Sequence, residues 1–217
     1  LYPYQGLNDK LFGIRTGDLI TVTAGTGAGK SSMMRELMHH LLMNTEHNVG
    51  VFSLEENIKQ TAFHLMSVQA NDRIYIKEIR EKYSLEQLKD FERKTIGTRR
   101  FYAFDHFGSI TTDEIEETRC AMLLVSHLRR ASGDKGQEQG KEISLSMLRG
   151  SHSIAQISDA VIALERDQQA QDPIQANTTA VRVLKNRYAG ETGVATYLLY
   201  DKETGRMSEI ENPFEVD

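Results

Sequence analysis

The sequence predicts an α/β fold in which a mostly parallel twisted sheet is flanked by helices and ends in antiparallel strands. Strand-like and helix-like segments alternate along most of the chain, and a run of strands follows near its end. One apolar strand also runs through a glycine-rich loop into an amphipathic helix, as parallel strands with helical crossovers do. The 217 residues suffice for one large core, so we expect a single domain over residues 1–217.

Each element is predicted from its own pattern of apolar residues. Strands are expected at 19–24, 49–54, 100–105, 120–126, 160–164, 179–184 and 194–200. Helices are expected from the glycine-rich loop to residues 44–48, at 58–70, 79–95 and 150–159, and from Thr112 to Glu117. Residues 6–10, 13–18 and the polar stretch after 164 are expected to be turns, and a turn at 189–193 pairs the last two strands as a hairpin.

For two of the predicted helices, the sequence also indicates which face packs against the core. Apolar residues recur at helical spacing after the glycine-rich loop and give a core-facing stripe. Its members are Met33, Met34, Leu37, Met38, Leu41 and Leu42. In the helix at 79–95, Leu85, Leu88 and Phe91 are expected to face inward.

Composition is that of an ordinary globular protein, with 39% apolar and 26% charged residues. No apolar run approaches the length of a membrane span, and the first residues show no signal-peptide pattern. The net charge of −5 argues against a uniformly basic surface for nucleic acid but allows local basic loops. Because the chain begins at Leu1 rather than Met, we expect it to be a piece of a longer protein.

Cys120 is the only cysteine of the sequence. A single thiol excludes an internal disulfide and a cysteine-based metal cluster, and it fits a reducing compartment. Its apolar neighbours predict a buried position within a strand.

The loop between the first strand and its helix has Walker A spacing, with Ala24 in place of the first glycine. Glycines let backbone N–H groups curl around an anionic oxygen, and the following helix directs its positive end at the same anion. Lys30 can reach the β- and γ-phosphates, and the Ser31 hydroxyl can ligate Mg²⁺. The alternative is a glycine-rich turn that binds nothing. The predicted nucleotide-binding residues are Ala24, Gly25, Thr26, Gly27, Ala28, Gly29, Lys30, Ser31 and Ser32.

Charged residues at strand ends are the next candidates. Glu55 follows a predicted strand at the sheet edge where α/β proteins bind ligands, so it is a candidate for positioning water, or else a helix N-terminal acid. Glu56 suits the second role better, because strand alternation would face it the other way. His127 closes another strand and is either catalytic or an ordinary strand-end histidine. Lys185 and Arg187 taken alone would be surface charges.

Five blocks together resemble ring-shaped replicative helicases with a RecA-like P-loop core. They are AGTGAGKSS, FSLEEN, LLVSHLRR, LRGSHSIAQISDAVIALERDQ and VLKNRYAGETGVATYLLYDKETG, in that order. The sequence is most similar to the helicase half of the primase-helicases of short-tailed phages, and less so to the mitochondrial Twinkle and bacterial DnaB helicases. The resemblance extends from about Gly6 to Gly205 and rests chiefly on the last two blocks.

The resemblance implies a role for each matching residue. Lys30 and Ser31 bind the triphosphate and Mg²⁺, and Glu55 activates water. His127 senses the γ-phosphate and reports it to the DNA loops, and Gln156 also lies near that phosphate. Arg166 and Tyr200 sandwich the nucleotide base.

The resemblance further implies that two residues act on the nucleotide of the next subunit. Arg187 matches the arginine finger, and Lys185 matches the lysine beside it. A finger stabilises charge on the transferring phosphoryl group. The implied motor hydrolyses an NTP, ATP or dTTP, at interfaces between subunits.

DNA contacts are expected from the loop after His127 and from the segment entering the next helix. Five basic and three acidic side chains between residues 129 and 150 give a small positive excess, which suits phosphate tracking around a ring. An ordinary solvated loop is the alternative. Ala155 stands where a basic residue is expected in the phage relatives. The candidates are Arg129, Arg130, Lys135, Lys141, Arg149 and Gly150.

A segment expected from the resemblance is missing between Glu117 and Thr118. Helicases of this kind carry there a Walker B strand that ends in a Mg²⁺-organising Asp, and a further long helix. The deficit exceeds one βαβ unit, at least roughly 30 residues. Asp105 ends another strand and is a poor substitute, because relatives have that strand too. We therefore expect Glu117 and Thr118 not to be peptide-bonded neighbours; a continuous junction would instead indicate a nucleotide-binding relic without hydrolysis.

The sequence thus predicts the motor domain of a hexameric or heptameric DNA helicase that translocates on single-stranded DNA. A fused primase domain, a DNA polymerase partner and a cytoplasmic location in a bacterium or phage-infected cell are further expectations, with the mitochondrial matrix less favoured. Two alternatives stay open: a RecA-like DNA-binding ATPase that does not unwind, and a nucleotide-binding module without hydrolysis.

Overall fold

The computed structural model describes residues 1–53, 55–72, 82–97, 100–104, 119–128, 139–148 and 151–214. The chain divides into two compact units. The first comprises Leu1–Lys30, Ile110–Tyr200 and Ser208–Asp217, and the second comprises Ser31–Ser109 and Asp201–Met207. Each unit is described below by itself.

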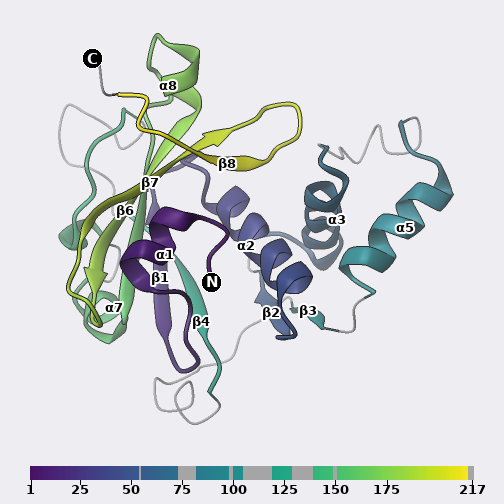
Figure 1. The fold of residues 1–217 in the computed structure, drawn as a ribbon, viewed down its shortest axis with the longest axis horizontal. Helices are drawn as coiled ribbons and strands as arrows, with labels where there is room; N and C mark the ends of the chain where they lie inside the picture. The colour runs from purple at the N-terminus through teal and green to yellow at the C-terminus, as the bar shows by residue number, and fades with distance from the viewer. Residues whose placement is uncertain are drawn as a thin grey trace. The chain divides into compact units, whose positions relative to one another are not determined.

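A six-stranded sheet forms the first unit, in the order β4-β1-β5-β6-β7-β8 (Figure 1). β1 pairs in parallel with β4 and β5, and β6 pairs antiparallel with both β5 and β7. The expected combination of a parallel core with an antiparallel C-terminal hairpin is confirmed. The strands are β1 (Leu19–Ala24), β4 (Met122–His127), β5 (Ala160–Glu165), β6 (Thr178–Asn186), β7 (Gly193–Tyr200) and β8 (Met207–Ile210).

The centre of this sheet is buried because its strands are apolar on both faces. Every residue of β1 and of β5 is buried, and β1 is in register with β4 from Leu19↔Met122 to Ala24↔His127. The polar side chains Thr21 and Thr23 are satisfied by hydrogen bonds to Ser158 and to the carbonyl of Ser126. The carboxyl ends of β1 and β4 therefore lie side by side, where β1 enters the glycine-rich loop.

Strand β4 lies at the edge of the sheet and is less buried than its apolar sequence predicts. Among the described residues β1 is its only strand partner, and the side chain of Val125 is 42% exposed. The predicted burial of Cys120 within this strand is wrong, because Cys120 precedes β4 and is exposed. Its carbonyl accepts a hydrogen bond from the N–H of Gly17, in the turn that leads into the strand.

Short helices complete the first unit. α1 (Gln5–Leu11) buries Leu7 and Leu11 and packs against β7, although the sequence predicts a turn there. α7 (Ser151–Ile157) lies within the predicted helix. α8 (Pro173–Asn177) falls in the predicted polar turn; Asp172 caps it and Pro173 begins it. A 3-10 helix, η1 (Leu145–Met147), precedes α7.

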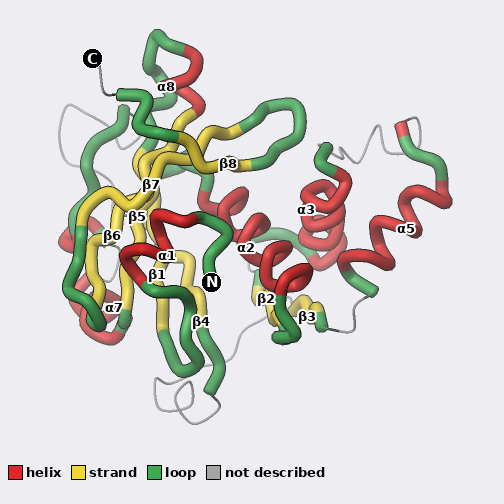
Figure 2. Tube along the Cα trace, viewed as in Figure 1, coloured by secondary structure: helices red, strands yellow, loops and turns green. Residues whose placement is uncertain are grey.

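The second unit combines helices with a two-stranded parallel sheet (Figure 2). α3 has the predicted bounds and α2 ends within the predicted range of 44–48, while β2, β3 and α5 span fewer residues than predicted. Asn57 and Ser84 form capping boxes with Gln60 and Gln87, which explains where α3 and α5 begin. The elements are α2 (Lys30–Asn44), β2 (Val49–Phe52), α3 (Ile58–Ala70), α5 (Leu85–Thr95) and β3 (Phe101–Phe104).

Two predictions about burial in this unit are wrong. Of the predicted buried strand β2 only Val49 is buried, because β3 is the only strand with which β2 pairs in the described chain. Leu85 does not face inward but is 69% exposed, since it is the first residue of α5, whereas Leu88 and Phe91 pack against Met66 as expected.

The core-facing stripe of α2 includes a charged residue that apolar spacing does not reveal. Glu36 is buried between Met33 and Leu37. Arg206 forms two hydrogen bonds with its carboxylate, at 2.6 and 3.0 Å, and the N–H of Met207 donates to it at 3.1 Å. A buried carboxylate is tolerated there because it is paired and hydrogen-bonded.

Several predictions lie outside the described residues. They are the helix from Thr112 to Glu117, Asp105, the junction of Glu117 with Thr118, and residues 79–81 of the predicted helix at 79–95. None of the helices that the structure describes is long and apolar enough to cross a membrane.

A glycine in α1 provides a test of its packing on β7. A Cβ placed on Gly6 would lie 2.0 Å from the carbonyl oxygen of Ala195. We expect Gly6→Ala to lower the free energy of unfolding by about 1–3 kcal/mol, as overpacked sites do, measured by urea denaturation. The matched control, Gln5→Ala on the exposed side of the same turn, should change it by less than about 0.5 kcal/mol. Equal midpoints for the two variants would contradict this packing.

Candidate functional site

The Walker loop joins β1 to α2, which confirms the predicted order of strand, loop and helix. Gly27 and Gly29 have backbone φ angles of 74° and 99°, which residues with a Cβ rarely adopt. The N–H of Ala28 donates to the carbonyl of Gly25 at 3.4 Å and closes a β-turn around Thr26 and Gly27. A positive φ at the third residue is what a type II turn requires.

Three alternate carbonyl groups of this loop are held by side chains. The Nζ of Lys30 donates to Ala24 at 3.2 Å, the Nε2 of Gln168 to Thr26 at 2.8 Å, and the Oγ1 of Thr179 to Ala28 at 3.2 Å. In a trans peptide the N–H points opposite to the C=O of the same unit. The N–H groups that follow these carbonyls, those of Gly25, Gly27 and Gly29, are therefore directed away from the three side chains.

Such a set of N–H groups is able to bind an anion. None of the turn hydrogen bonds within the described chain is donated by Gly27 or Gly29. Successive N–H groups together with the start of a helix form a concave site of positive potential. The loop thus has the chemistry expected of a phosphate site, with Lys30 at its end.

His127 lies next to this loop. It is the last residue of β4 and is paired in register with Ala24, the last residue of β1. Its side chain is exposed at the carboxyl edge of the sheet, where α/β proteins bind ligands.

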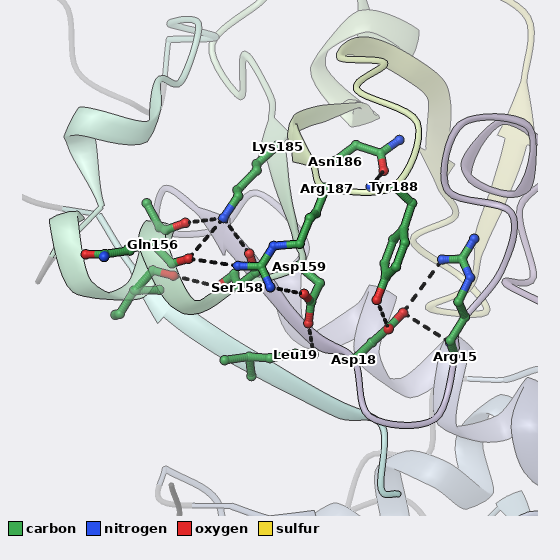
Figure 3. A network of polar contacts seen from close by, with 12 residues as sticks. Arg15, Asp18, Leu19, Gln156, Ser158, Asp159, Lys185, Asn186, Arg187 and Tyr188 are labelled. Carbon is green, nitrogen blue, oxygen red and sulfur yellow. Dashed lines mark hydrogen bonds and ion pairs between the residues drawn. The ribbon is translucent and has the colours of Figure 1, made fainter. Parts of the chain in front are cut away.

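Arg187 lies near Leu19, at the opposite end of β1 from the Walker loop (Figure 3). Its N–H donates to the carbonyl of Asp159 at 2.9 Å, and the N–H of Asp159 donates in turn to the carbonyl of Leu19 at 2.8 Å. Its Nη1 also pairs with the Asp159 carboxylate at 2.7 Å, while half of the side chain, 52%, stays exposed. β1 rises about 3.3 Å per residue, so the Leu19 end lies roughly 17 Å from the Walker loop.

Lys185 and Arg187 both hold the C-terminal end of α7. The Nζ of Lys185 donates to the carbonyls of Ala155, Gln156 and Ser158 at 2.7, 3.1 and 2.6 Å, which uses all three of its donors. Partial burial and the neighbouring Arg187 lower the pKa of Lys185. The Nη2 of Arg187 donates to the same Gln156 carbonyl at 3.2 Å. The Gln156 side chain itself extends away from both cations (Figure 3).

The residue after Arg187 is held as well. The hydroxyl of Tyr188 donates to the buried Asp18 at 2.6 Å, and the guanidinium of Arg15 lies 4.2 Å from the centre of its ring. The hydrogen bond to Asp18, with burial and the charge of that carboxylate, raises the pKa of Tyr188 to about 12. Asn186, which is buried, donates from Nδ2 to the carbonyl of Lys10 at 2.8 Å. Each side chain from 185 to 188 is therefore fixed to the rest of the unit by at least one hydrogen bond.

The structure brings Arg166 and Tyr200 together. The guanidinium carbon of Arg166 lies 5.9 Å from the centre of the Tyr200 ring. Arg166 donates to the carbonyl of Ala176 at 2.7 Å and to the Asn177 side chain at 3.0 Å, and burial lowers its pKa. The pair thus presents one planar cation and one aromatic ring toward each other.

The second unit contains Glu55, which is exposed at the turn after β2. The next residue, Glu56, pairs with Arg35 at 2.7 Å and with His64 at 3.0 Å. Burial opposes ionisation of Glu56, but the hydrogen bond from His64 and the charge of Arg35 outweigh it and lower its pKa. Asn57, rather than Glu56, caps α3. Glu56 thus ties the turn that bears Glu55 to α2 and α3.

Of the DNA candidates, the structure describes Lys141 alone; Arg129, Arg130, Lys135, Arg149 and Gly150 lie outside the described residues. The segment around Lys141 is fastened to the turn after β5. Gln139 forms a β-bridge with Asp167, and the N–H of Ile143 donates to the buried Glu165 at 2.7 Å.

Reasoning from the sequence missed three residues of this region: Asp159, Gln168 and Thr179. Asp159 directly precedes β5, so a search for charged residues at both ends of the predicted strands would have identified it. Nothing in the sequence pattern distinguishes Gln168 or Thr179, because their partners lie more than 140 residues away.

Comparison with known proteins identifies the family and the fold of this chain. The sequence profile of the DnaB-like helicase C terminal domain matches residues 2–118. A DNA helicase/primase of Enterobacteria phage T3 is 27% identical over an alignment of 253 residues. The alignment covers 93% of this chain and 44% of that protein. The chain thus spans less than half the length of this relative.

Two solved structures have a similar fold at 17% sequence identity and a TM-score of 0.75. One of them, an ATPase domain, is matched over 96% of this chain and 90% of that one. The other, a DnaB-like replicative helicase determined in a study of its interactions with primase, is matched over 97% and 62%. Their agreement confirms the expected RecA-like α/β fold. Because the profile covers more than half of its residues, this chain belongs to the DnaB-like helicase C-terminal domain family.

Proposed function

We propose that this chain is the NTP-hydrolysing motor of a ring-shaped DNA helicase that translocates on single-stranded DNA. The observation that carries the proposal is the position of Arg187, half exposed and at the opposite end of β1 from the Walker loop. A long arginine side chain does not bridge a strand of that length. Arg187 can therefore meet only a triphosphate that belongs to another molecule, as a finger supplied between subunits does.

Within one subunit, the Walker loop binds the triphosphate through the N–H groups of Gly25, Gly27 and Gly29 and through Lys30. Ser31 would hold Mg²⁺, which neutralises charge on the phosphate oxygens when it is bound. Glu55 activates the attacking water, and His127 responds to the γ-phosphate. Gln156 lies with Arg187 at the opposite end of β1, so it would respond to the γ-phosphate of a neighbouring subunit. Arg166 and Tyr200 take the base between them, and cation–π attraction supports such a stack.

Lys185 has a different role in this proposal from the one its motif implies. Its three donors hold the carbonyl groups that end α7, so in this conformation it supports the helix of Gln156. Release of these bonds would be needed before Lys185 reached a neighbouring phosphate. Lys141 and the basic residues of 129–150 contact the DNA backbone.

The missing Walker B segment is part of the proposal. Strand β4 is apolar, yet one of its edges has no strand partner among the residues described, which is where an additional strand would pair. The alignment with the phage T3 protein runs over 253 residues, whereas 93% of this 217-residue chain is about 202, so about 50 aligned positions have no counterpart here. Peptide mapping tests this directly: a peptide in which Thr118 follows Glu117 would contradict it.

The wider context follows from the relatives. The phage T3 protein is named a helicase/primase, and the DnaB-like structure concerns interactions with primase. We propose that this motor likewise works with a primase, at a replication fork in the cytoplasm of a bacterial or phage-infected cell, as a hexamer or heptamer.

Substitution of the finger is the first test. We expect Arg187→Ala to lower DNA-stimulated NTP turnover by roughly 10³- to 10⁵-fold, the effect of a finger in other P-loop enzymes, while nucleotide binding persists. Turnover is measured with and without single-stranded DNA, and binding with a fluorescent nucleotide. The control Arg93→Ala removes another exposed arginine and should leave turnover unchanged. Undiminished turnover in Arg187→Ala would refute the finger.

Mixing two inactive variants is the second test. Lys30→Ala removes nucleotide binding and Arg187→Ala removes the finger, so each is inactive alone. In random mixed rings, an intact Walker loop meets an intact finger at about one interface in four, and turnover should return to about a quarter of the wild-type value. No recovery, with mixed assembly shown by mass, would mean that Lys30 and Arg187 of the same subunit act on one nucleotide, and it would contradict a finger supplied between subunits. Fork unwinding by the wild type then separates a helicase from a DNA-binding ATPase that does not unwind.

A further inference from the structure

We infer that Gln168 is a positioning residue of the phosphate site: its side chain fixes the Thr26–Gly27 peptide so that the Gly27 N–H faces the phosphates. The inference rests on the proposed nucleotide site and gives a role to Gln168, which ends one of the five blocks of the resemblance but has no role assigned there. Gln168 follows β5 by three residues, and its Nε2 donates to the Thr26 carbonyl at 2.8 Å.

A second observation shows how closely the side-chain amide of Gln168 approaches Gly27. A Cβ on Gly27 would lie 2.8 Å from Oε1 and 2.9 Å from Nε2 of Gln168. The amide of Gln168 therefore occupies the space that a side chain at residue 27 would need. The positive φ of 74° favours glycine at residue 27, and a side chain there would also displace the amide of Gln168.

The peptide that Gln168 holds is the one in this loop that is easiest to reverse. Thr26 and Gly27 are the central residues of a β-turn, and types I and II differ chiefly in the orientation of the central peptide. With glycine at the third position, both orientations are sterically allowed. Reversal would turn the Gly27 N–H away from the anion site and present the Thr26 carbonyl oxygen to it. The hydrogen bond from Gln168 selects the productive orientation.

Gln168 is itself mounted on a fixed turn. Asp167 forms a β-bridge with Gln139, and the buried Glu165 pairs with Arg182 at 3.0 Å. Arg166, two residues before Gln168, bears the proposed base contact. One turn thus serves both ends of the nucleotide, through Arg166 at the base and Gln168 at the loop.

Binding of two probes tests the inference. ATP and inorganic tripolyphosphate, which has no base or sugar, each displace a fluorescent nucleotide from the full-length protein. We expect Gln168→Ala to weaken both by about 3- to 10-fold, the range that corresponds to one neutral hydrogen bond. Gln168→Glu should weaken both by about tenfold or more, because a carboxylate cannot donate to the Thr26 carbonyl. The control Gln169→Glu also replaces an amide with a carboxylate, but at the next residue along the chain. It should bind both probes within twofold of the wild type.

The outcomes separate the explanations. Binding of both probes within twofold of the wild type by Gln168→Ala and Gln168→Glu would overturn the inference. Weakened ATP with unchanged tripolyphosphate would also overturn it, since Gln168 would then contact the base or sugar. Thermal denaturation without ligand should show all variants within about 2 °C of the wild type, and a larger loss in both Gln168 variants would make the role merely structural. Failure of the wild type to bind either probe would instead refute the nucleotide site.

Discussion

The carboxylate of Asp159 makes the contacts that hold together the end of the sheet opposite the Walker loop. One oxygen accepts the N–H of Leu19 at 2.9 Å, and the other pairs with Arg187 at 2.7 Å. The side chain is only 12% exposed, and a charge so placed is stable only when its hydrogen bonds and counter-ion are supplied. The start of β1, the start of β5 and the turn after β6 are thereby fixed to one another around a single buried charge.

This arrangement gives the two ends of β1 different roles. At the carboxyl end, side chains from α2, β6 and the turn after β5 hold the carbonyl groups of the glycine-rich loop. At the other end, Asp159 and the carbonyl groups of α7 hold an arginine that remains half exposed. The two groups to which the proposal assigns the triphosphate and the finger thus lie at opposite ends of one strand, each held by its own hydrogen bonds.

The sequence predicted those elements whose pattern is local. The continuous apolar strands at 19–24 and 160–165 and the capped helix at 58–70 were found because composition, length and caps agree. α1 and α8 were missed because five to seven residues carry too little periodicity. Leu85 and Cys120 were misplaced because element ends expose residues that their neighbours suggest are buried. The contacts of Gln168, Lys185 and Asp159 depend on residues far along the chain, so no window of sequence reveals them.

Among the residues that the structure describes, one edge of β4 has no strand partner, and this has a practical consequence for expressing residues 1–217 as one continuous chain. An apolar strand with such an edge is a template for edge-to-edge aggregation, and Val125 adds exposed apolar surface beside it. Solubility would then depend on concentration. A synthetic strand added in trans would restore it by fragment complementation, much as a donated strand caps an incomplete sheet in pilus subunits.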